Sequence, residues 1–369
     1  MMKIMHLTFD MAIGGTEQVI CQLIEGADRA LFDPQICCID GQVGALGQKL
    51  QQQGILVQAI ARQPGFDWSL VRQIRQLLKN SKIDILHCHQ YSPWIYGWLA
   101  AFGTPTNVIF TEHGRFFPDR YRRKAWLVNK IMAATTSHIT AISAATKKAL
   151  AQFEFIPETK IQLVYNGIQA ISAADTVKTQ LKNQLQIAEG SLVIGTVARL
   201  DPIKNQPMIL KAFAQLRLQL PTLRLLIVGD GPEHAMLQQL ARSLQLEDSV
   251  IFAGFQSPAT DYMALMDVFL LPSLSEGTSM TLLEAMSLGI PCVVSDVGGN
   301  AEVIQSGKNG IVMHENTESA LVAAVLEYAC DEPRRMAAAA HAKQRFSDAF
   351  SAAQMCRQYA DLYLSCRSE

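Results

Sequence analysis

The sequence lacks long apolar runs and paired cysteine motifs, and both absences narrow the classes of protein it can encode. Its N-terminal stretch MMKIMHLTF reaches the charged Asp10 too soon for a signal peptide, and no run approaches the roughly 20 apolar residues that span a bilayer. The eight cysteines are scattered without a C-x-x-C pair, which argues against a zinc ribbon, a thioredoxin-like motif and a disulfide framework. We therefore expect a reduced, cytoplasmic protein that is attached to a membrane surface at most.

Several nucleotide- and ester-binding motifs are also missing. No G-x-x-x-x-G-K-[ST] loop is present, and no G-x-G-x-x-G follows a candidate strand, which counts against kinases and dinucleotide enzymes. No G-x-S-x-G elbow points to an α/β-hydrolase. The absence of Asp-x-Asp leaves no obvious carboxylate pair to hold a metal at a diphosphate. We expect neither a metal nor a redox cofactor.

The charge of the chain is close to zero, with 32 basic and 33 acidic residues, so its overall electrostatics do not indicate nucleic acid as a partner. The charge is unevenly distributed, however. Residues 1–168 hold 17 Lys/Arg and 12 Asp/Glu, a net of +5, and the remainder holds 15 and 21, a net of −6. This asymmetry favours an anionic partner for the N-terminal half.

Short apolar runs alternate with longer helical patterns along the chain. Such runs suit parallel strands buried on both faces, so the alternation predicts βαβ units. The strands expected in the first half are Lys3–Phe9, Gln35–Ile39, Ile55–Ala59, Ile83–His87, Asn107–Thr111 and His138–Ile142, with helices at Thr16–Glu25, Ser69–Leu78 and Tyr121–Ala134. The strands expected in the second half are Leu192–Ala198, Leu223–Val228, Val250–Ala253, Val268–Leu271 and Pro291–Ser295.

A length of 369 residues suggests about two domains at roughly 150 residues each. The polar stretch 169–190 shows no strand pattern and is the expected linker between an N-terminal domain, residues 1–168, and a C-terminal domain, residues 191–348. We also expect a last helix, residues 349–369, which can pack on either domain and is a candidate to complete the N-terminal one. We expect two doubly wound α/β domains that face each other across a cleft, with ligands beyond the carboxyl ends of the strands.

Two loops carry residues suited to phosphate. Gly14 and Gly15 follow the first strand, where the backbone can pass close to a ligand and a helix directs free N–H groups outward. The alternative is a tight turn with Thr16 as N-cap. Arg199 and Lys204 follow the first strand of the second half, where two cations can converge on a diphosphate or simply remain solvated.

A third loop places two carboxylates eight residues apart, Glu276 and Glu284, around the start of a helix. The backbone N–H groups between them can bind sugar hydroxyls and phosphate oxygens, and carboxylates are good acceptors for paired hydroxyls. The alternative is a structural N-cap at Thr278 or Ser279 with Glu284 merely exposed. That alternative does not explain the second glycine turn after the next strand, Gly298-Gly299.

Residues 268–304, VFLLPSLSEGTSMTLLEAMSLGIPCVVSDVGGNAEVI, resemble the signature region of the family 4 glycosyltransferases, a large group that retains anomeric configuration. The group has the GT-B fold of two Rossmann-like domains. The other matching pieces, in order, are Gly14-Gly15, Thr111-Glu112-His113, Val164–Ile168, Arg199 with Lys204, Val228–Pro232 and Gly254-Phe255. The resemblance covers nearly the whole chain. Because it has the run Thr-Glu-His-Gly-Arg at 111–115, the sequence resembles those bacterial members of the family that assemble surface polysaccharides.

The resemblance implies a role for each matching residue. Glu284 should bind the ribose of the donor nucleotide, and Glu276 should contact the donor sugar. Arg199 and Lys204 should neutralise the diphosphate, and His113 should lie beside the reacting sugar carbon. The resemblance implies three further sets of donor-binding residues. Gly14 and Gly15 of the N-terminal domain should approach the diphosphate, and Gly229 and Phe255 should lie around the base. The backbone of Gly277, Thr278, Ser279 and Met280 should bind the sugar and the phosphates. Many family members have an aromatic residue where Thr278 stands, so their sugar preference does not transfer.

Two further histidines and a basic segment remain to be assigned. His87 and His89 also occur in family members, and we interpret them as cleft-wall or structural residues, with contact to the acceptor as a lesser alternative. They are not convincing zinc ligands, because no third soft ligand accompanies them at metal-site spacing. A basic and aromatic segment follows His113. It is either a plain exposed helix start or a surface for a phosphate-bearing acceptor or an anionic membrane. Its members are Arg115, Arg120, Tyr121, Arg122, Arg123, Lys124 and Trp126.

The resemblance thus implies a retaining, hexosyltransferase-type enzyme that takes a nucleotide diphosphate sugar, with UDP favoured over GDP, and an acceptor that is a saccharide or a lipid-linked saccharide. The pathway would be polysaccharide, lipopolysaccharide or glycoconjugate biosynthesis at the inner face of the cytoplasmic membrane. Two alternatives stay open. One is a non-hydrolysing nucleotide-sugar epimerase of the same fold, and the other is a silent nucleotide-sugar-binding scaffold.

Overall fold

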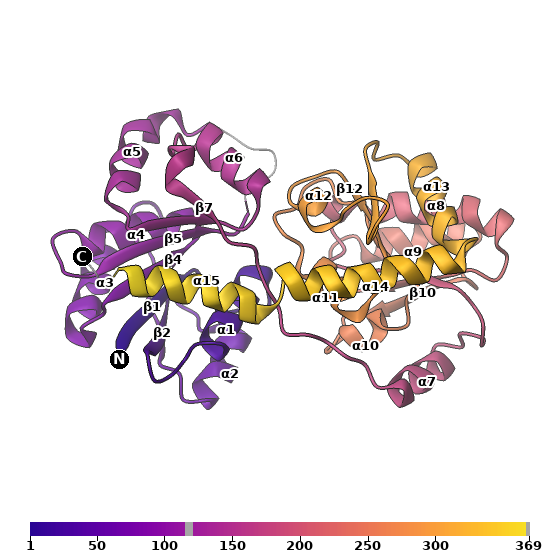
Figure 1. Cartoon of the computed structure of the whole chain (residues 1–369), viewed down its shortest axis with the longest axis horizontal. Helices are drawn as coiled ribbons and strands as arrows, with labels where there is room; N and C mark the ends of the chain where they lie inside the picture. The colour runs from indigo at the N-terminus through magenta and orange to yellow at the C-terminus, as the bar shows by residue number, and fades with distance from the viewer. Residues whose placement is uncertain (115–120, 367–369) are drawn as a thin grey trace. The chain divides into compact units, whose positions relative to one another are not determined.

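The computed structural model describes residues 1–114 and 121–366 and divides into two compact units (Figure 1). Unit 1 comprises Met1–Gln169 and Ser351–Glu369, and unit 2 comprises Ala170–Phe350. The segment expected to be a linker, 169–190, therefore belongs mostly to unit 2. It contains the helix α7 (Asp175–Gln184), and its Ile187 is buried. The backbone N–H of Ile171 also donates to Ser287 Oγ at 2.8 Å.

Unit 1 is built on a seven-stranded parallel sheet in the order β3-β2-β1-β4-β5-β6-β7. Its strands are β1 (Met2–Thr8), β2 (Phe32–Cys38), β3 (Val57–Ala59), β4 (Ile85–His89), β5 (Asn107–Glu112), β6 (His138–Ala141) and β7 (Ile161–Leu163). Its helices are α1 (Gly15–Glu25), α2 (Gly44–Gln52), α3 (Trp68–Ser81), α4 (Tyr91–Ala101), α5 (Trp126–Thr135), α6 (Ala144–Phe153) and α15 (Ala352–Ser365). Two short 3-10 helices, η1 (Arg123–Ala125) and η2 (Glu158–Lys160), complete the unit.

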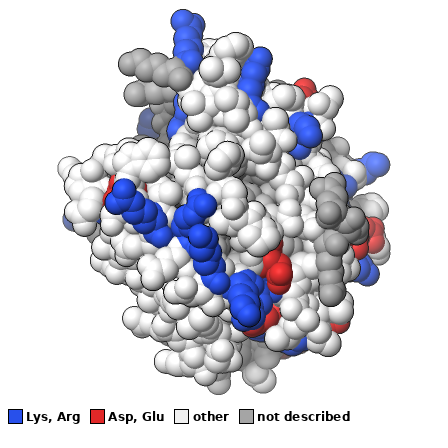
Figure 2. Space-filling model, turned by 90° about the vertical axis from the view of Figure 1, so that its left-hand side faces the viewer, with Lys and Arg blue, Asp and Glu red and all other residues white. Residues whose placement is uncertain are grey.

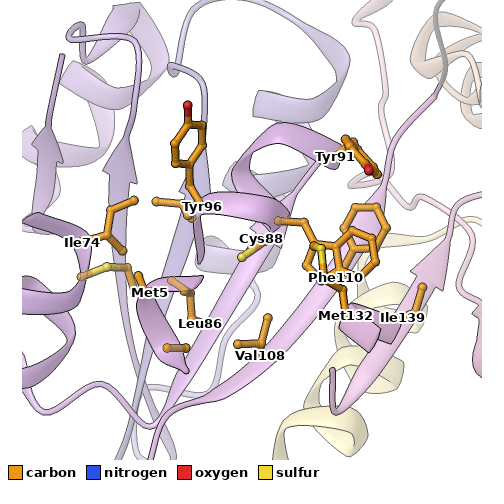
Figure 3. Close-up of a cluster of buried hydrophobic side chains, with 14 of the residues drawn as sticks. Met5, Ile74, Leu86, Cys88, Tyr91, Tyr96, Val108, Phe110, Met132 and Ile139 are labelled. Carbon is orange, nitrogen blue, oxygen red and sulfur yellow. The ribbon is translucent and has the colours of Figure 1, made fainter. Parts of the chain in front are cut away.

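The apolar strands of unit 1 are covered on both faces, as their continuous hydrophobic runs predict. On the face shown in Figure 3, side chains of β1, β4 and β5 pack against helices such as α3 and α4. Trp94 of α4 stacks on Phe110 of β5 with ring centroids 4.2 Å apart, and its indole N–H donates to Thr136 Oγ1 at 3.0 Å. This packing fixes β4 and β5, the strands that lead to the histidines discussed below.

The C-terminal helix α15 belongs to unit 1 and covers part of its sheet. The chain returns to this unit where the backbone N–H of Ala352 donates to the carbonyl of Ile168 at 2.7 Å. Gly167 lies beside this junction, and a Cβ added there would lie 2.4 Å from the carbonyl oxygen of Ser351. Buried Tyr359 and Tyr363 of α15 then hydrogen-bond to side chains of the central strands.

Unit 2 is built on a six-stranded parallel sheet in the order β10-β9-β8-β11-β12-β13. Its strands are β8 (Val193–Val197), β9 (Arg224–Val228), β10 (Val250–Gly254), β11 (Val268–Leu271), β12 (Cys292–Ser295) and β13 (Gly310–Met313). Besides α7, its helices are η3 (Pro202–Lys204), α8 (Gln206–Gln219), α9 (His234–Ser243), α10 (Thr260–Met263), α11 (Met280–Leu288), α12 (Asn300–Val303), α13 (Glu318–Ala329) and α14 (Glu332–Ala349).

Both units are the Rossmann-like, doubly wound α/β sheets that the alternation predicts. The eleven predicted strands are all present, with ends that shift by a few residues. Two strands that the sequence pattern missed, β7 and β13, lie at sheet edges. In the part of the chain that the structure describes, no helix is both long and apolar enough to cross a bilayer.

Candidate active site

In each unit the predicted site residues follow the carboxyl ends of the strands. Strand order reverses direction between β8 and β11 in unit 2 and between β1 and β4 in unit 1. Ligands of open α/β sheets bind outside such switch points, because the loops from the two strands diverge there. Lys204 follows β8 and Glu276 follows β11, whereas Gly15 follows β1.

At the switch point of unit 2, Lys204 and Glu276 form an ion pair. Lys204 Nζ lies 2.6 Å from Glu276 Oε1, and the carboxylate side chain is only 7% exposed. Ser273 Oγ donates to the same oxygen at 2.7 Å. The pair therefore holds a cation and an anion at one point of the sheet edge, which sequence spacing alone did not predict.

Hydrogen bonds from a side chain and from the backbone join the two loops that carry this pair. Asp201 caps η3 by accepting from the N–H groups of Ile203 and Lys204. Asn205, in a left-handed conformation with φ 55°, donates from Nδ2 to the carbonyl of Pro272 at 3.3 Å. The N–H of Leu274 donates to the carbonyl of Ile203 at 2.7 Å. These bonds fix the position from which Lys204 reaches Glu276.

Arg199 is placed differently from Lys204. Its side chain is 72% exposed, and its Nε lies 3.8 Å from Asp201 Oδ2. Its carbonyl accepts a hydrogen bond from Gln206 Nε2 at 3.0 Å, so the backbone is anchored while the guanidinium is solvated. The two cations thus face separate carboxylates, and neither is directed at the other.

The loop before α11 is constrained by glycines. Ser279 is the N-cap of α11, so the structural alternative for this residue is correct, and Thr278 is buried beside it. Gly298 has φ 54°, and a Cβ there would lie 1.7 Å from the carbonyl oxygen of Glu276. The N–H of Gly299 donates to the carbonyl of Gly277 at 2.8 Å. The glycine turn after β12 therefore packs directly against the Glu276-Gly277 loop.

Glu284 lies one turn into α11, and its side chain is half-buried rather than exposed. Burial raises the pKa of its carboxyl to about 7, because desolvation disfavours the charged form. Within the described residues no side chain or backbone group hydrogen-bonds to this carboxylate. A partly desolvated acceptor without a partner is costly in an unliganded protein, and it is a typical feature of a binding site.

The positions expected around the base lie on neighbouring strands. Gly229 follows β9 with φ 133°, and a Cβ there would lie 2.0 Å from the carbonyl oxygen of Ala198. Its N–H donates to the carbonyl of Gly254 at 2.8 Å, which brings the end of β10 close. Phe255 then exposes 61% of its surface. An exposed aromatic ring beside a backbone that only glycine permits is consistent with a stacking surface.

In unit 1 the helix α1 begins two residues earlier than it would with Thr16 as its N-cap. Gly14 is its N-cap, so Thr16 is not the cap; it lies buried within the first turn. Its hydroxyl accepts from Gln90 Nε2 at 3.3 Å. Gln90 follows β4 with φ 72° and ψ 165°, a conformation that costs a residue other than glycine about 1–3 kcal/mol. Backbone strain of this kind clusters at functional sites.

His113 follows β5 and is half-buried. Its Nε2 lies 2.8 Å from His89 Nδ1, and its buried Nδ1 has no hydrogen-bond partner among the residues that the structure describes. Burial lowers the pKa of His113 to about 3, so the ring is neutral at pH 7. The structure thus places an unsatisfied nitrogen of a neutral imidazole at the carboxyl edge of the sheet.

His6 is the histidine that sequence reasoning missed. It lies on β1, buried beside His87 and His89 of β4, and its Nδ1 is 2.9 Å from His89 Nε2. No third soft ligand accompanies His87 and His89 at metal-site spacing in the sequence, but the sheet brings His6 to them from a distant part of the chain. The ligand nitrogens of these three rings lie within 4.8 Å of one another. The expectation that no metal binds stays a prediction.

The basic segment after His113 is only partly described. Arg115 and Arg120 lie outside the described residues, as does the side chain of Lys124. Arg122 is paired although its side chain is 40% exposed, because its Nε lies 2.9 Å from the buried carboxylate of Glu154 and its guanidinium lies 3.9 Å from the centroid of the Tyr91 ring.

Comparison with known proteins agrees with this arrangement. Residues 13–170 match the model for "Glycosyltransferase Family 4", and residues 177–345 match that for "Glycosyl transferases group 1". N-acetyl-alpha-D-glucosaminyl L-malate synthase of Bacillus anthracis is 26% identical over 83% of this chain and 81% of its own. The Escherichia coli UDP-Gal:alpha-D-GlcNAc-diphosphoundecaprenol alpha-1,3-galactosyltransferase is 26% identical over 98% of this chain and 96% of its own.

Among solved structures, Anabaena Alr3699/HepE in complex with UDP superposes with a TM-score of 0.87 at 24% identity, covering 99% of this chain and 100% of that one. At this identity the superposition shows the fold. The two family models together span most of the sequence, one on each unit. The chain therefore belongs to the family 4 glycosyltransferases and is a nucleotide-sugar-dependent glycosyltransferase with the GT-B fold.

Proposed function

We propose that this enzyme transfers a hexose from a UDP-sugar to a lipid-linked saccharide, with retention of anomeric configuration, in the assembly of a bacterial surface polysaccharide. The observation that carries the proposal is the Lys204–Glu276 pair at the switch point of unit 2, beside the start of α11. A fixed cation next to a fixed carboxylate suits a ligand with a negative diphosphate at one end and a hydroxyl-rich sugar at the other.

Lys204 can serve both partners at once. An ammonium group has three N–H donors, and the side chain is 24% exposed while it contacts Glu276. One donor can therefore stay on Glu276 while another meets a phosphate oxygen, and a charge-assisted bond of this kind contributes about 1.5–3 kcal/mol. Arg199, which is mostly exposed, would turn from Asp201 towards the second phosphate. The two cations would stabilise the negative charge that develops as UDP leaves.

The rest of the donor would lie along α11 and the neighbouring strands. The backbone N–H groups of Gly277–Met280 would meet sugar and phosphate oxygens at the positive end of the helix. Glu284 would accept the two ribose hydroxyls, which gives its carboxylate the partners it lacks. Gly229 and Phe255 would border the base. Glu276 would bind a hydroxyl of the sugar through Oε2, because Ser273 and Lys204 both bind Oε1.

Unit 1 would supply the groups that meet the reacting end of the donor. Gly14 and Gly15 would approach the diphosphate with the N–H groups of α1, since no side chain caps this helix. The unsatisfied Nδ1 of His113 would hydrogen-bond to the sugar near the carbon that reacts. No metal is needed in this scheme, because Arg199, Lys204 and two helix N-termini replace the charge that a divalent ion would supply.

The substrates are inferred from relatives. The E. coli relative that matches almost the full length is named for UDP-Gal and a diphosphoundecaprenol-linked sugar, and the Anabaena structure contains UDP. A uracil nucleotide and a lipid-linked acceptor are therefore the substrates we propose here. We place the enzyme in the cytoplasm at the inner face of the cytoplasmic membrane, where both substrates would be available.

A surface of unit 1 supports this placement. On α5, four apolar side chains are about half exposed: Trp126 at 45%, Leu127 at 59%, Val128 at 49% and Ile131 at 49%. Lys130 on the same helix lies over the Trp126 ring, with Nζ 4.4 Å from its centroid. Figure 2 looks onto the end of unit 1 that carries α3 and α5 in Figure 1, and more Lys and Arg than Asp and Glu are in view there. A helix with such a surface suits an anionic bilayer.

The proposal is tested by incubating the purified protein with labelled UDP-glucose, UDP-galactose, UDP-N-acetylglucosamine and GDP-mannose, with and without a bacterial lipid extract. We expect label to enter the lipid fraction from a UDP-sugar only, with an α linkage by NMR. Release of an epimerised sugar or nucleotide without acceptor would favour the epimerase. Tight UDP binding without any turnover would favour the scaffold, and transfer from GDP-mannose alone would refute the donor assignment.

A further inference from the structure

We propose that His6 and His89 are positioning residues, which form a hydrogen-bonded chain that fixes the tautomer and orientation of His113. The proposal rests on the proposed function in one respect, namely that His113 meets the donor sugar. It assigns a role to His6, which sequence reasoning missed, and to His89, which was interpreted from the sequence as a cleft-wall or structural residue.

The chain consists of two ring-to-ring contacts. His6 Nδ1 lies 2.9 Å from His89 Nε2, and His89 Nδ1 lies 2.8 Å from His113 Nε2. Successive rings are close to parallel, with interplanar angles of 24° and 29°. The contacts are of hydrogen-bond length, and each joins an Nδ1 to an Nε2, so the three rings run head to tail.

The strands hold these rings in place. His6 lies on β1, His89 on β4, and His113 follows β5, and these three strands are neighbours in the sheet. His89 pairs in register with Thr111, two residues before His113. The rings of His6 and His89 are almost fully buried. The chain is therefore part of a rigid frame rather than a mobile surface cluster.

A head-to-tail chain of neutral imidazoles couples the protons of all three rings. A neutral imidazole has one N–H and one bare nitrogen, so each contact needs a donor on one side and an acceptor on the other. If His113 Nε2 donates, His89 and His6 must also carry their protons on Nε2. If His6 Nδ1 donates, all three carry their protons on Nδ1. A mixed arrangement would set two N–H groups or two lone pairs against each other.

This coupling determines whether the Nδ1 of His113 is a hydrogen-bond donor or an acceptor towards a ligand. This Nδ1 has no hydrogen-bond partner among residues 1–114 and 121–366, so this atom is the one left to face the sugar. It is a bare acceptor in the first arrangement and a donor in the second. His6, more than 100 residues away in sequence, thereby controls the hydrogen bond that His113 can make. Burial, which lowers the pKa of His6 and of His113 to about 3, keeps the rings neutral as the coupling requires.

A metal held by His6, His87 and His89 is the competing use of these rings, because their nitrogens lie within 4.8 Å of one another. His87, however, already bonds to Tyr363 at 2.8 Å and to Thr111 at 2.7 Å. Both nitrogens of His89 are engaged in the chain. A metal would have to replace at least two of these bonds, so the geometry favours the chain.

The direct test is nitrogen-15 NMR of the full chain labelled in its histidine rings, since the shift separates a protonated ring nitrogen from a bare one. At pH 7 we expect His6, His89 and His113 to be neutral and to share one tautomer. Opposite tautomers among the three, or a charged ring, would overturn the proposal. So would a stoichiometric metal, found by elemental analysis of the purified protein and lost in the His6→Leu variant.

Variants test whether the chain matters to His113. His89→Leu removes both contacts, whereas His89→Asn keeps an amide near the position of the ring Nδ1. We expect His113 to become a mixture of tautomers in the first variant and to keep mainly one in the second. His87→Gln is the matched control, because His87 is equally buried on β4 but outside the chain, and it should leave the His113 signals unchanged.

Turnover gives the second readout. In His89→Leu we expect kcat to fall by roughly 10–100-fold, with partial recovery in His89→Asn and a UDP dissociation constant within about twofold of the wild type. An unaltered His113 spectrum in folded His89→Leu would refute positioning. The NMR readout needs no substrate, so failure of the wild type to transfer sugar refutes the proposed function and leaves the chain testable. If His89→Leu does not fold, the wild-type and His89→Asn spectra still decide.

Discussion

Glu284 gives a prediction in which stability and binding change in opposite directions. Burial raises the pKa of its carboxyl from the ordinary 4.5 to about 7. At 1.36 kcal/mol per pKa unit, ionised Glu284 destabilises the folded protein by up to about 3 kcal/mol. Glu284→Gln keeps the shape of the side chain and removes the charge. We therefore expect the variant to be more stable than the wild type at pH 8.

The sign of the pH dependence follows from the direction of the shift. Because the folded-state pKa lies above the unfolded one, stability linked to this carboxyl is present below pH 4.5 and is lost as the pH rises through about 7. The difference in Tm between variant and wild type should thus be near zero at pH 4 and reach roughly 6–12 °C at pH 8, at roughly 2–4 °C per kcal/mol for a unit of this size. Glu247→Gln, at an exposed position of unit 2, is the control and should show no such difference.

The same variant should bind UDP more weakly. Loss of a charged acceptor for the ribose hydroxyls costs about 1.5–3 kcal/mol, or roughly 10–100-fold in the dissociation constant. Titration calorimetry of the wild type near pH 7, in two buffers of different ionisation enthalpy, should also show proton release on binding. Equal Tm values of Glu284→Gln and the wild type at pH 8 would refute the claim that burial desolvates this carboxylate. Unchanged UDP affinity would refute the contact with ribose.

Three further predictions concern the diphosphate and the membrane. Lys204→Ala and Arg199→Ala should each lower kcat by roughly 10²–10³-fold and weaken donor binding, and a near-normal rate in either variant would contradict the charge-stabilised departure of UDP. Transfer activity should survive EDTA, whereas a large loss that magnesium or manganese restores would show that a metal takes part. The double variant Leu127→Ser with Ile131→Ser should sediment less with anionic vesicles than the wild type, and Leu218→Ser, on the exposed face of α8, should not. Equal sedimentation by all three proteins would exclude α5 as the membrane contact.

The order of strands and helices could be read from the sequence because buried parallel strands form unbroken apolar runs. The pattern failed where a strand is an edge strand, as with β7 of three residues, Ile161–Leu163. At the C-terminus the predicted helix, 349–369, is present as α15, Ala352–Ser365, and a break separates it from the end of α14 at Ala349. The break falls at Phe350 and Ser351, where the chain passes from one unit to the other.

The site was predictable in part for the same reason. Loops at the carboxyl ends of parallel strands gather at one edge, so Arg199, Lys204 and the Glu276 loop could be placed near one another. Which carboxylate Lys204 would bind had no sequence signal, because the partners lie 72 residues apart. His6 gave no signal either, since one histidine within an apolar strand indicates only a buried side chain until β1 is paired with β4.

The way α15 completes unit 1 has a consequence for how the chain folds during synthesis. The ribosome makes all of unit 2 between Gln169 and Ser351, so the sheet of unit 1 emerges long before the helix that covers it. Until then, His87 and Thr111 lack the hydroxyls of Tyr363 and Tyr359 that satisfy them in the finished protein. In the nascent chain, the face of the unit 1 sheet that α15 covers in the finished protein therefore stays uncovered while unit 2 is being made. Chaperone dependence in the cell should follow the time taken to translate residues 170–350.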